Sequence, residues 1–371
     1  MRYAVDSIYA STRLGAFLVA TSPAAVIIMA AGKGTRMRSA TPKVLHQIGG
    51  RSLLNHAVVA ARGLQPQYLV AVVRHQRDDV VAHLERVAPD VVIADQDEIP
   101  GTGRAVACGL AALPADLTGP VVVTSGDVPL LDTATLEALL DQHVSRADAV
   151  TILTTELADP SGYGRVVRTE EGAVAGIVEH RDASESQLLI KEINAGVYVF
   201  DAAHLREALG GLGTDNDQGE VYLTDVVAAA YQAGKSTSAL VVTDTWLVEG
   251  CNDRVQLAQL GAELNRRILE HWMRTGVTIV DPSSTWVDVD AKIGQDAYLE
   301  PGVIVHGATV IGDEAYVGAH SVLDNVEVPD GAVVAPLSLL DAKRNQHDLL
   351  PTHPHGQTAT RRQIIHDWHY Q

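Results

Sequence analysis

The order of hydrophobic and polar positions predicts an α/β fold for residues 24–155. Short apolar runs typical of buried strands occupy residues 25–31, 68–73, 91–94, 120–124 and 149–155. Apolar side chains recur at helical spacing over residues 52–62, 76–87, 102–113 and 133–145. This alternation predicts a mostly parallel sheet covered by helices, and ligands bind beyond the carboxyl ends of the strands in such sheets.

Beyond residue 155 the pattern becomes mixed and then helical. Strands are predicted at residues 165–168, 174–179 and 195–200, and a helix at 222–233. Residues 252–274 form a long amphipathic segment. A helix of that length, between one domain and a repeat, is typical of a connecting arm.

A six-residue repeat follows the arm. Every sixth residue from Val287 to Leu323 is aliphatic, at seven consecutive positions. The residue four places after each is mostly small, until Glu327 breaks the series. A strict period of six is the signature of a parallel β-helix. We expect Pro329 to end the period after two or three coils, and the polar, His-rich residues from 341 onward to form a tail or cap.

Composition narrows the class of protein. The 371-residue chain is 46% hydrophobic but only 4% aromatic, which suits aliphatic α/β and β-helical cores. Its formal net charge of −18 argues against nucleic acid and anionic membranes as partners, because both are bound through clustered Lys and Arg. Cys108 and Cys251 provide neither a disulfide framework nor metal-binding spacing.

The start of the chain predicts no membrane insertion. No apolar run approaches the roughly 20 residues that a membrane helix needs. The apolar patch at residues 14–20 lacks a clear basic segment before it, so an export signal is disfavoured. We interpret residues 1–23 as an N-terminal extension or the product of an unused upstream start, and expect a cytoplasmic protein.

A glycine-rich loop follows the first predicted strand, at residues 29–37. It is not a Walker A loop, because Ile27 stands where that motif needs its first glycine. It is not a dinucleotide fingerprint either, because Met37 replaces the third glycine, which disfavours a dehydrogenase. Gly32 and Gly34 still allow backbone N–H groups to approach an anion, and we expect a helix N-terminus after the loop to add positive potential.

Three cations accompany the loop. Lys33, Arg36 and Lys43 fall within eleven residues. A solvated basic loop is the plain alternative, but this many cations on a glycine-rich loop after a strand favours phosphate binding.

Further motifs follow in order along the chain. They are residues 42–46 (Pro-Lys-Val-Leu-His), Gln96 with 101–103, 126–130, 162–165, 179–183, 193–196, 222–225 and 249–254. With the loop, they resemble the family of bacterial bifunctional N-acetylglucosamine-1-phosphate uridyltransferase/glucosamine-1-phosphate acetyltransferases. The resemblance covers roughly residues 24–335.

The resemblance implies specific residue roles. The implied nucleotide-binding residues are Ala30, Ala31, Gly32, Lys33, Gly34, Gln96, Gly101 and Thr102. The implied catalytic residues are Arg36, Lys43 and Asp127, with Asp127 and Asn252 binding Mg²⁺. The implied sugar-binding residues are Gly164, Glu179 and Asn194. The implied reaction joins UTP to N-acetylglucosamine 1-phosphate for peptidoglycan precursor supply, in a homotrimer.

These residue types suit the implied chemistry. A sugar 1-phosphate is already ionised, so it attacks a triphosphate without a general base, and the protein supplies positioning and charge neutralisation. Mg²⁺ takes one or two protein oxygen ligands plus substrate phosphates. Plainer alternatives are that Asp127 is a cap or turn residue, that Asn252 only caps the next helix, and that Glu179 is a surface charge.

The resemblance also implies the fold class and domain order. We expect a Rossmann-like nucleotidyltransferase domain with a mostly parallel mixed sheet, then a helical arm and a short left-handed parallel β-helix. The expected boundaries are 1–23 (extension), 24–251 (nucleotidyltransferase domain), 252–280 (arm), 281–335 (truncated β-helix) and 336–371 (tail or cap).

The chain departs from the family in two places. Ser125 stands where many relatives have Tyr, which can loosen the sugar pocket. The repeat also stops before the coils that carry the acetyltransferase site, so we predict no acetylation of glucosamine 1-phosphate. In the tail, His353 and His355 could ligate metal, but a cap is favoured, and we expect residues 336–350 to cover the open strand edge.

Two other functions stay open. One is a pyrophosphorylase for ADP-, GDP- or dTDP-sugars, since the Gln96 amide suits the imide edge of uracil and thymine alike. The other is a non-catalytic regulatory or assembly subunit, against which Lys43, Asp127 and Asn252 argue together.

Overall fold

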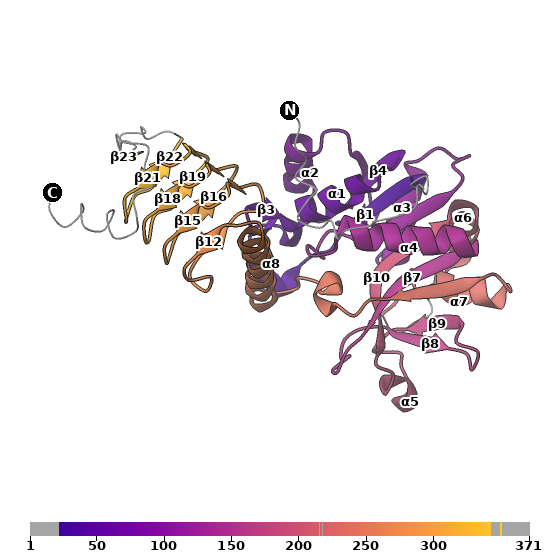
Figure 1. The fold of residues 1–371 in the computed structure, drawn as a ribbon. Helices are drawn as coiled ribbons and strands as arrows, with labels where there is room; N and C mark the ends of the chain where they lie inside the picture. The colour runs from indigo at the N-terminus through magenta and orange to yellow at the C-terminus, as the bar shows by residue number, and fades with distance from the viewer. Residues whose placement is uncertain (1–21, 215, 217, 343–348, 351–371) are drawn as a thin grey trace. The chain divides into compact units, whose positions relative to one another are not determined.

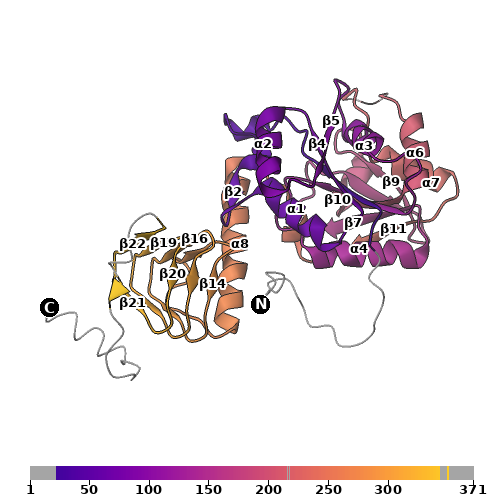
Figure 2. The same ribbon diagram turned by 90° about the horizontal axis from the view of Figure 1, so that it is seen from above.

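The computed structural model describes residues 22–214, 216, 218–342 and 349–350 (Figures 1 and 2). These residues divide into two compact units. The sheet unit contains residues 22–48 and 52–260, and the β-helix unit contains residues 49–51 and those from 261 onward. The division falls within helix α8 (Arg254–Arg274).

The sheet unit is built on a mixed, mostly parallel sheet, as predicted. Its strand order is β11-β7-β10-β6-β1-β4-β5. The strands are β1 (Ala25–Met29), β4 (Tyr68–Val73), β5 (Val92–Asp95), β6 (Pro120–Ser125), β7 (Val150–Glu156), β10 (Glu192–Asp201) and β11 (Thr237–Val241). The antiparallel member is β10, which pairs with β6 and β7, while β8 (Arg165–Arg168) and β9 (Val174–Val178) extend from it.

Helices cover both faces of this sheet, so its central strands are apolar throughout. Val26 and Ile28 of β1 belong to one core with α1 (Leu53–Gly63), α2 (Arg77–Val87) and α4 (Thr133–Arg146). Ala25 and Ile27 belong to the other core. Its helices are α3 (Thr102–Ala111), α6 (Ala202–Gly211) and α7 (Asp225–Gln232).

The predicted strands and helices are confirmed to within a few residues, while several short elements are additional. These are α5 (Glu185–Leu188), α6, β11, β2 (Gln47–Ile48), β3 (Arg51–Ser52) and the 3₁₀ helices η2 (Thr35–Met37), η3 (Lys43–Leu45) and η4 (Thr245–Val248). Among the described helices, none combines the length and hydropathy needed to cross a bilayer. Of the expected N-terminal extension, residues 1–21 lie outside the described part of the chain.

The β-helix unit contains a left-handed parallel β-helix with three strands per coil. One sheet stacks β12 (Thr278–Ile279), β15 (Tyr298–Leu299), β18 (Tyr316–Val317) and β21 (Val333–Val334). The second stacks β13 (Trp286–Val287), β16 (Ile304–His306), β19 (Val322–Asp324) and β22 (Leu339–Asp341). The third stacks β14 (Lys292–Ile293), β17 (Val310–Ile311) and β20 (Glu327–Val328). The fully or nearly buried Leu299, Val305 and Ile311 show that the aliphatic position of each repeat points inward.

The prediction that Pro329 ends the repeat was wrong. From Val287 the aliphatic stack continues to Leu340, because the spacing shortens once, to the five residues between Leu323 and Val328, and then returns to six. Asn325 turns the corner of this shorter step with a φ of 51°. The β-helix therefore extends beyond the expected boundaries of 281–335. After β22, β23 (Leu349–Leu350) pairs antiparallel with β21.

The second half of α8 packs within the β-helix unit instead of acting only as an arm. The buried Asn265 donates through Nδ2 to the carbonyl oxygen of Thr285 at 2.8 Å and accepts from the backbone N–H of Val287 at 3.0 Å. Leu264, Ile268 and Leu269 are buried. The helix thus satisfies backbone groups beside β13.

Candidate active site

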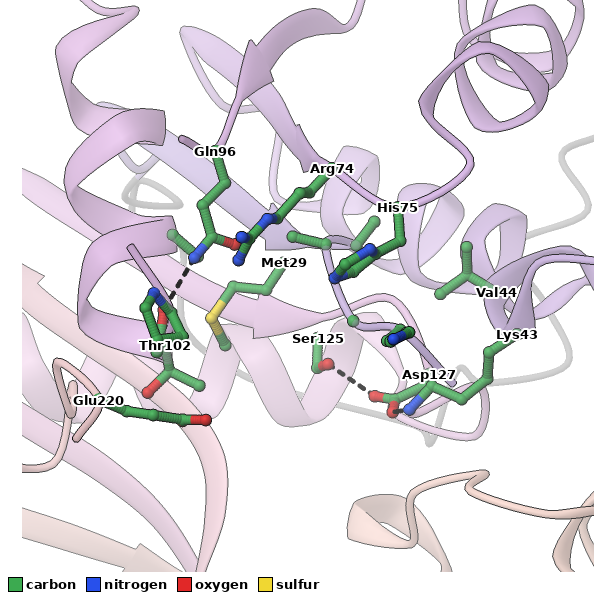
Figure 3. A pocket seen from close by; sticks show the side chains of 17 residues that line it. Met29, Lys43, Val44, Arg74, His75, Gln96, Thr102, Ser125, Asp127 and Glu220 are labelled. Carbon is green, nitrogen blue, oxygen red and sulfur yellow. Dashed lines mark hydrogen bonds and ion pairs between the residues drawn. The ribbon is translucent and has the colours of Figure 1, made fainter. Parts of the chain in front are cut away.

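A cavity of about 350 Å³ lies at the carboxyl ends of β1, β4 and β6 (Figure 3). This is the edge at which parallel sheets bind ligands. It is lined by Met29, Ala30, Ala31, Gly32, Lys33, Lys43, Val44, Arg74, His75, Gln96, Pro100, Gly101, Thr102, Ala105, Ser125, Asp127 and Glu220. Most residues predicted to bind nucleotide therefore share one cavity.

The glycine-rich loop closes tightly on Lys43. Gly34 has a φ of 61°, and a Cβ there would lie 2.6 Å from Cβ of Lys43. The helix expected after the loop is absent: η2 spans only three residues, and Arg38, which follows it, has a φ of 47°. Left-handed residues on both sides stop helix propagation. Anion binding at this loop must therefore rely on backbone N–H groups and side-chain cations.

Lys43 joins two residues that are far apart in the sequence. Its Nζ contacts Oδ2 of Asp127 and lies 3.5 Å from Oδ1 of Asn252. Only 12% of the Lys43 side chain and 16% of the Asp127 side chain are exposed. Arg36 also donates from Nη2 to Oδ1 of Asn252 at 2.8 Å. The predicted catalytic residues thus meet at one point.

Neither Asp127 nor Asn252 is a helix cap. Asp132 caps α4 by accepting from the backbone N–H of Thr135 at 2.8 Å. Asp253 accepts from the backbone N–H groups at the start of α8, including that of Gln256 at 2.9 Å. The helix-cap interpretations of Asp127 and Asn252 are therefore wrong, although Asp127 does lie in the turn that follows β6.

Ser125 orients Asp127. Its hydroxyl donates to Oδ1 of Asp127 at 2.6 Å, while Lys43 binds the other carboxylate oxygen (Figure 3). The sequence prediction concerned only the size of Ser125. The contact shows that the hydroxyl also holds the carboxylate in place.

The donor set at Lys43 fits a divalent cation that shares its coordination with substrate phosphates. One carboxylate and one amide oxygen converge on the same point, and hard cations such as Mg²⁺ need few protein oxygens beside phosphate ligands. Within the described ranges, no group of three His, Cys, Asp or Glu residues could hold a metal by protein ligands alone.

The far end of the cavity is shaped by the segment from Gln96 to Thr102. Gln96 donates from Nε2 to the carbonyl oxygens of Ile99 at 2.9 Å and Gly101 at 3.3 Å. Thr102 accepts from the backbone N–H of Leu223 through its hydroxyl at 3.1 Å. The donor of the Gln96 amide is therefore used within the loop, which leaves its oxygen as the group suited to accept an N–H from a base.

Among the titratable residues that line the cavity, Arg74, His75 and Glu220 were not predicted from the sequence (Figure 3). Arg74 and His75 directly follow β4, so the rule on carboxyl strand ends could have identified them. Burial lowers the pKa of His75, and the charges of Arg74 and Lys33 lower it further. The His75 ring is thus neutral near pH 7, although the side chains beside it, Arg74 and Lys33, are cationic.

The predicted sugar-binding residues form a second group, outside that cavity. The backbone N–H of Asn194 on β10 donates to the carbonyl oxygen of Gly164 at 2.9 Å. A Cβ on Gly164 would lie 3.5 Å from Oε2 of Glu179 and 2.9 Å from Ile177. Burial raises the pKa of Glu179, whose Oε1 accepts from Thr224 at 3.2 Å. Glu179 is thus half-buried, and the surface-charge interpretation is wrong.

A glycine-rich loop, clustered cations and a carboxylate–amide pair at the carboxyl edge of such a sheet define a nucleotidyltransferase. Residues 26–222, more than half of the chain, match the family model of the MobA-like NTP transferase domain. The chain belongs to this family. Residues 290–325 match the bacterial transferase hexapeptide model (six repeats).

The chain is also similar to several proteins described as bifunctional protein GlmU. It is 55% identical to that of Pseudarthrobacter chlorophenolicus over 316 residues, covering 85% of this chain and 64% of the relative. It is 56% identical to that of Kineococcus radiotolerans over 312 residues, covering 84% and 63%. It is 56% identical to that of Mycolicibacterium vanbaalenii over 315 residues, covering 84% and 64%. The chain thus spans less than two thirds of the length of these relatives.

Proposed function

We propose that this chain transfers the uridylyl group of UTP to N-acetylglucosamine 1-phosphate, with Mg²⁺ as cofactor. The products are UDP-N-acetylglucosamine and pyrophosphate. The observation that carries the proposal is the meeting of Lys43, Asp127 and Asn252 beside the glycine-rich loop. The similarity to GlmU proteins supports the choice of substrates.

The reaction requires positioning more than acid–base chemistry. An ionised phosphate oxygen of the sugar 1-phosphate forms a bond to the α-phosphorus of UTP, and the bond from that phosphorus to the bridging oxygen breaks. Pyrophosphate leaves with the electron pair, and no proton has to be removed from the nucleophile. Holding two anions in line is therefore the main task of the protein.

The cations of the cavity suit this task. Lys33 and Arg74 line it along the nucleotide-binding edge, and Lys43 lies where the α-phosphate is expected. Fixed cations in a partly buried site stabilise the charge that develops during transfer. A Mg²⁺ ion held by Asp127 and Asn252 would neutralise phosphate charge and help to align the two substrates.

The sugar would lie against Gly164, Glu179 and Asn194. Oε2 of Glu179 and Cβ of Asn194 lie beside Gly164, where an added Cβ would come within 2.9 Å of Ile177. The carboxylate suits a ring with several hydroxyl groups. The homotrimer, the role in peptidoglycan precursor supply and the lack of acetyltransferase activity stay predictions. Acetylation of glucosamine 1-phosphate by the purified chain would contradict the last of them.

The test is pyrophosphate release by the purified protein with Mg²⁺, UTP and N-acetylglucosamine 1-phosphate. We expect release that needs both substrates, and a loss of about 10²-fold or more in Asp127→Ala. The exposed Asp116→Ala serves as the matched control and should keep wild-type activity.

Two other outcomes would replace the proposal. Release with dTTP, ATP or GTP but not with UTP would indicate another pyrophosphorylase. The first of these is compatible with the Gln96 contact, because thymine and uracil share an imide edge. No release with any triphosphate and sugar phosphate would favour a non-catalytic subunit.

A further inference from the structure

A line of hydrogen bonds centred on Glu249 connects two parts of the sheet unit. Tyr163 donates from its hydroxyl to Oε2 of Glu249 at 3.2 Å. Gln256 donates from Nε2 to Oε1 of Glu249 at 3.1 Å. The backbone N–H of Asn252 donates to Oε1 of Gln256 at 2.8 Å. All four residues are partly buried, and both oxygens of the carboxylate are used.

The direction of these hydrogen bonds is determined by the groups at either end. A carboxylate only accepts and a backbone N–H only donates, so the Gln256 amide fits between Glu249 and Asn252 in a single orientation. The Tyr163 hydroxyl is protonated and donates, because burial and the charges of Glu249 and Asp127 raise its pKa to about 12. The line is therefore matched donor to acceptor throughout.

One end of this line is the predicted metal ligand. The Oδ1 atom of Asn252 faces Lys43 and Arg36. The preceding residue, Cys251, donates its backbone N–H to the carbonyl oxygen of Asp127 at 2.8 Å. Gln256 therefore holds the backbone of Asn252 from one side, while Asp127 holds the segment from the other.

The opposite end is the predicted sugar site. Tyr163 directly precedes Gly164, whose carbonyl oxygen accepts from the backbone N–H of Asn194 at 2.9 Å. A shift of the Tyr163 side chain would thus be transmitted to the backbone that is expected to contact the sugar. Glu249 lies between the two ends: it accepts directly from Tyr163 and is connected to Asn252 through Gln256.

We propose that Glu249, acting through Gln256, is a positioning residue that aligns the metal ligand Asn252 and couples it to the sugar-binding loop at Tyr163. The inference rests on the proposed function for the identity of the metal and the sugar. It predicts that the pairing between residues 249 and 256 matters for metal affinity, although neither side chain is a metal ligand.

The test exchanges donors and acceptors along the line. In Gln256→Glu two carboxylates face each other and the hydrogen bond between them is lost. Adding Glu249→Gln in the same chain places an amide donor at residue 249 opposite the carboxylate at residue 256. The negative charge then lies at residue 256 instead of residue 249. Glu249→Gln alone should be mild, because the Tyr163 hydroxyl can accept instead of donating. Gln259→Glu, exposed on the same helix, is the matched control.

We expect Gln256→Glu to weaken Mn²⁺ binding in the presence of UTP by about tenfold, the usual scale for residues that orient metal ligands. Mn²⁺ is the probe, measured by electron paramagnetic resonance. Amide hydrogen exchange over residues 249–256 should rise, and KM for N-acetylglucosamine 1-phosphate should increase. The Mn²⁺ affinity of the double variant should lie within about threefold of the wild-type affinity.

Wild-type Mn²⁺ affinity and exchange in Gln256→Glu would overturn the proposal. So would a double variant that is no better than Gln256→Glu. Failure of the proposed function is a separate result: the wild-type protein would release no pyrophosphate. Hydrogen exchange over residues 249–256 would still decide whether Glu249 positions Asn252.

Discussion

Gly101 shows how one backbone position shapes the base end of the cavity. Its φ is 117°, and a Cβ there would lie 2.3 Å from the carbonyl oxygen of Val221. Two residues later, Gly103 donates its backbone N–H to the same oxygen at 2.8 Å. Residues 101–103 thus lie against the backbone of Val221, which cannot move aside as a flexible side chain could. The position of Gln96 depends on this contact.

Gly101→Ala should therefore cost about 1–3 kcal/mol of stability and raise KM for UTP, because both the φ angle and the close contact resist a side chain. Thermal unfolding and pyrophosphate-release kinetics measure the two effects. Gly172→Ala is the matched control: its φ is 86°, but no heavy atom lies within 4 Å of the added Cβ. Equal effects in both variants would mean that the contact with Val221 is unimportant.

At the scale of elements, the junction of α4 and β7 contains a buried polar network. Nδ1 of the buried His143 lies 3.0 Å from the hydroxyl of Thr151. That hydroxyl donates to Oδ2 of the buried Asp148 at 2.9 Å. The hydroxyls of Ser236 and Ser238 also donate to Asp148, which ties the edge strand β11 to β7. These contacts hold the helix, two strands and the connecting turn together.

Burial lowers the pKa of His143 and outweighs the opposing effect of Asp148. The unfolded chain therefore takes up a proton below about pH 6.5, where the folded protein does not, so stability is lost as pH falls from about 7.5 to about 5.5. His143→Gln should lose less stability over this range, since its amide does not titrate. Urea unfolding followed by circular dichroism at both pH values tests this, and an equal loss in the two proteins would contradict it.

At the scale of the whole molecule, the end of the β-helix exposes strand edges that could recruit other chains. β22 continues one sheet, and β23 lies antiparallel along β21 in another. The pairing of β23 agrees with the expectation that the segment after residue 336 covers an edge, whereas β22 adds a further strand to the β-helix. The tail histidines His353 and His355 lie outside the described residues.

A chain ending at Pro336 lacks β22 and β23 and should aggregate, because β21 then presents the edge that β23 otherwise pairs with. A chain ending at Leu350 keeps both strands and should behave like the full chain. Size-exclusion chromatography with light scattering compares them. A soluble, monodisperse protein ending at Pro336 would show that the edges need no cover.

Much of this molecule could be predicted from local sequence, because burial repeats with the geometry of the chain. The apolar run around Ile27 and the helical spacing around Leu54 indicated a covered parallel sheet, since side chains alternate or turn at fixed periods. The six-residue step from Val287 indicated the β-helix for the same reason. The loop at Gly32 and Gly34 and the motif around Asp127 identified one edge of the sheet as the site.

Only the tertiary structure decided how distant residues meet. Nothing in the local spacing shows that Asn252 faces Lys43, that Asp253 takes the cap position, or that Gln256 lies between Glu249 and Asn252. A strict six-residue period also does not predict the single shortened step before Val328, because the β-helix accommodates one fewer residue at a corner. Periodicity records which side of an element is buried, whereas contacts between elements depend on packing that no single segment contains.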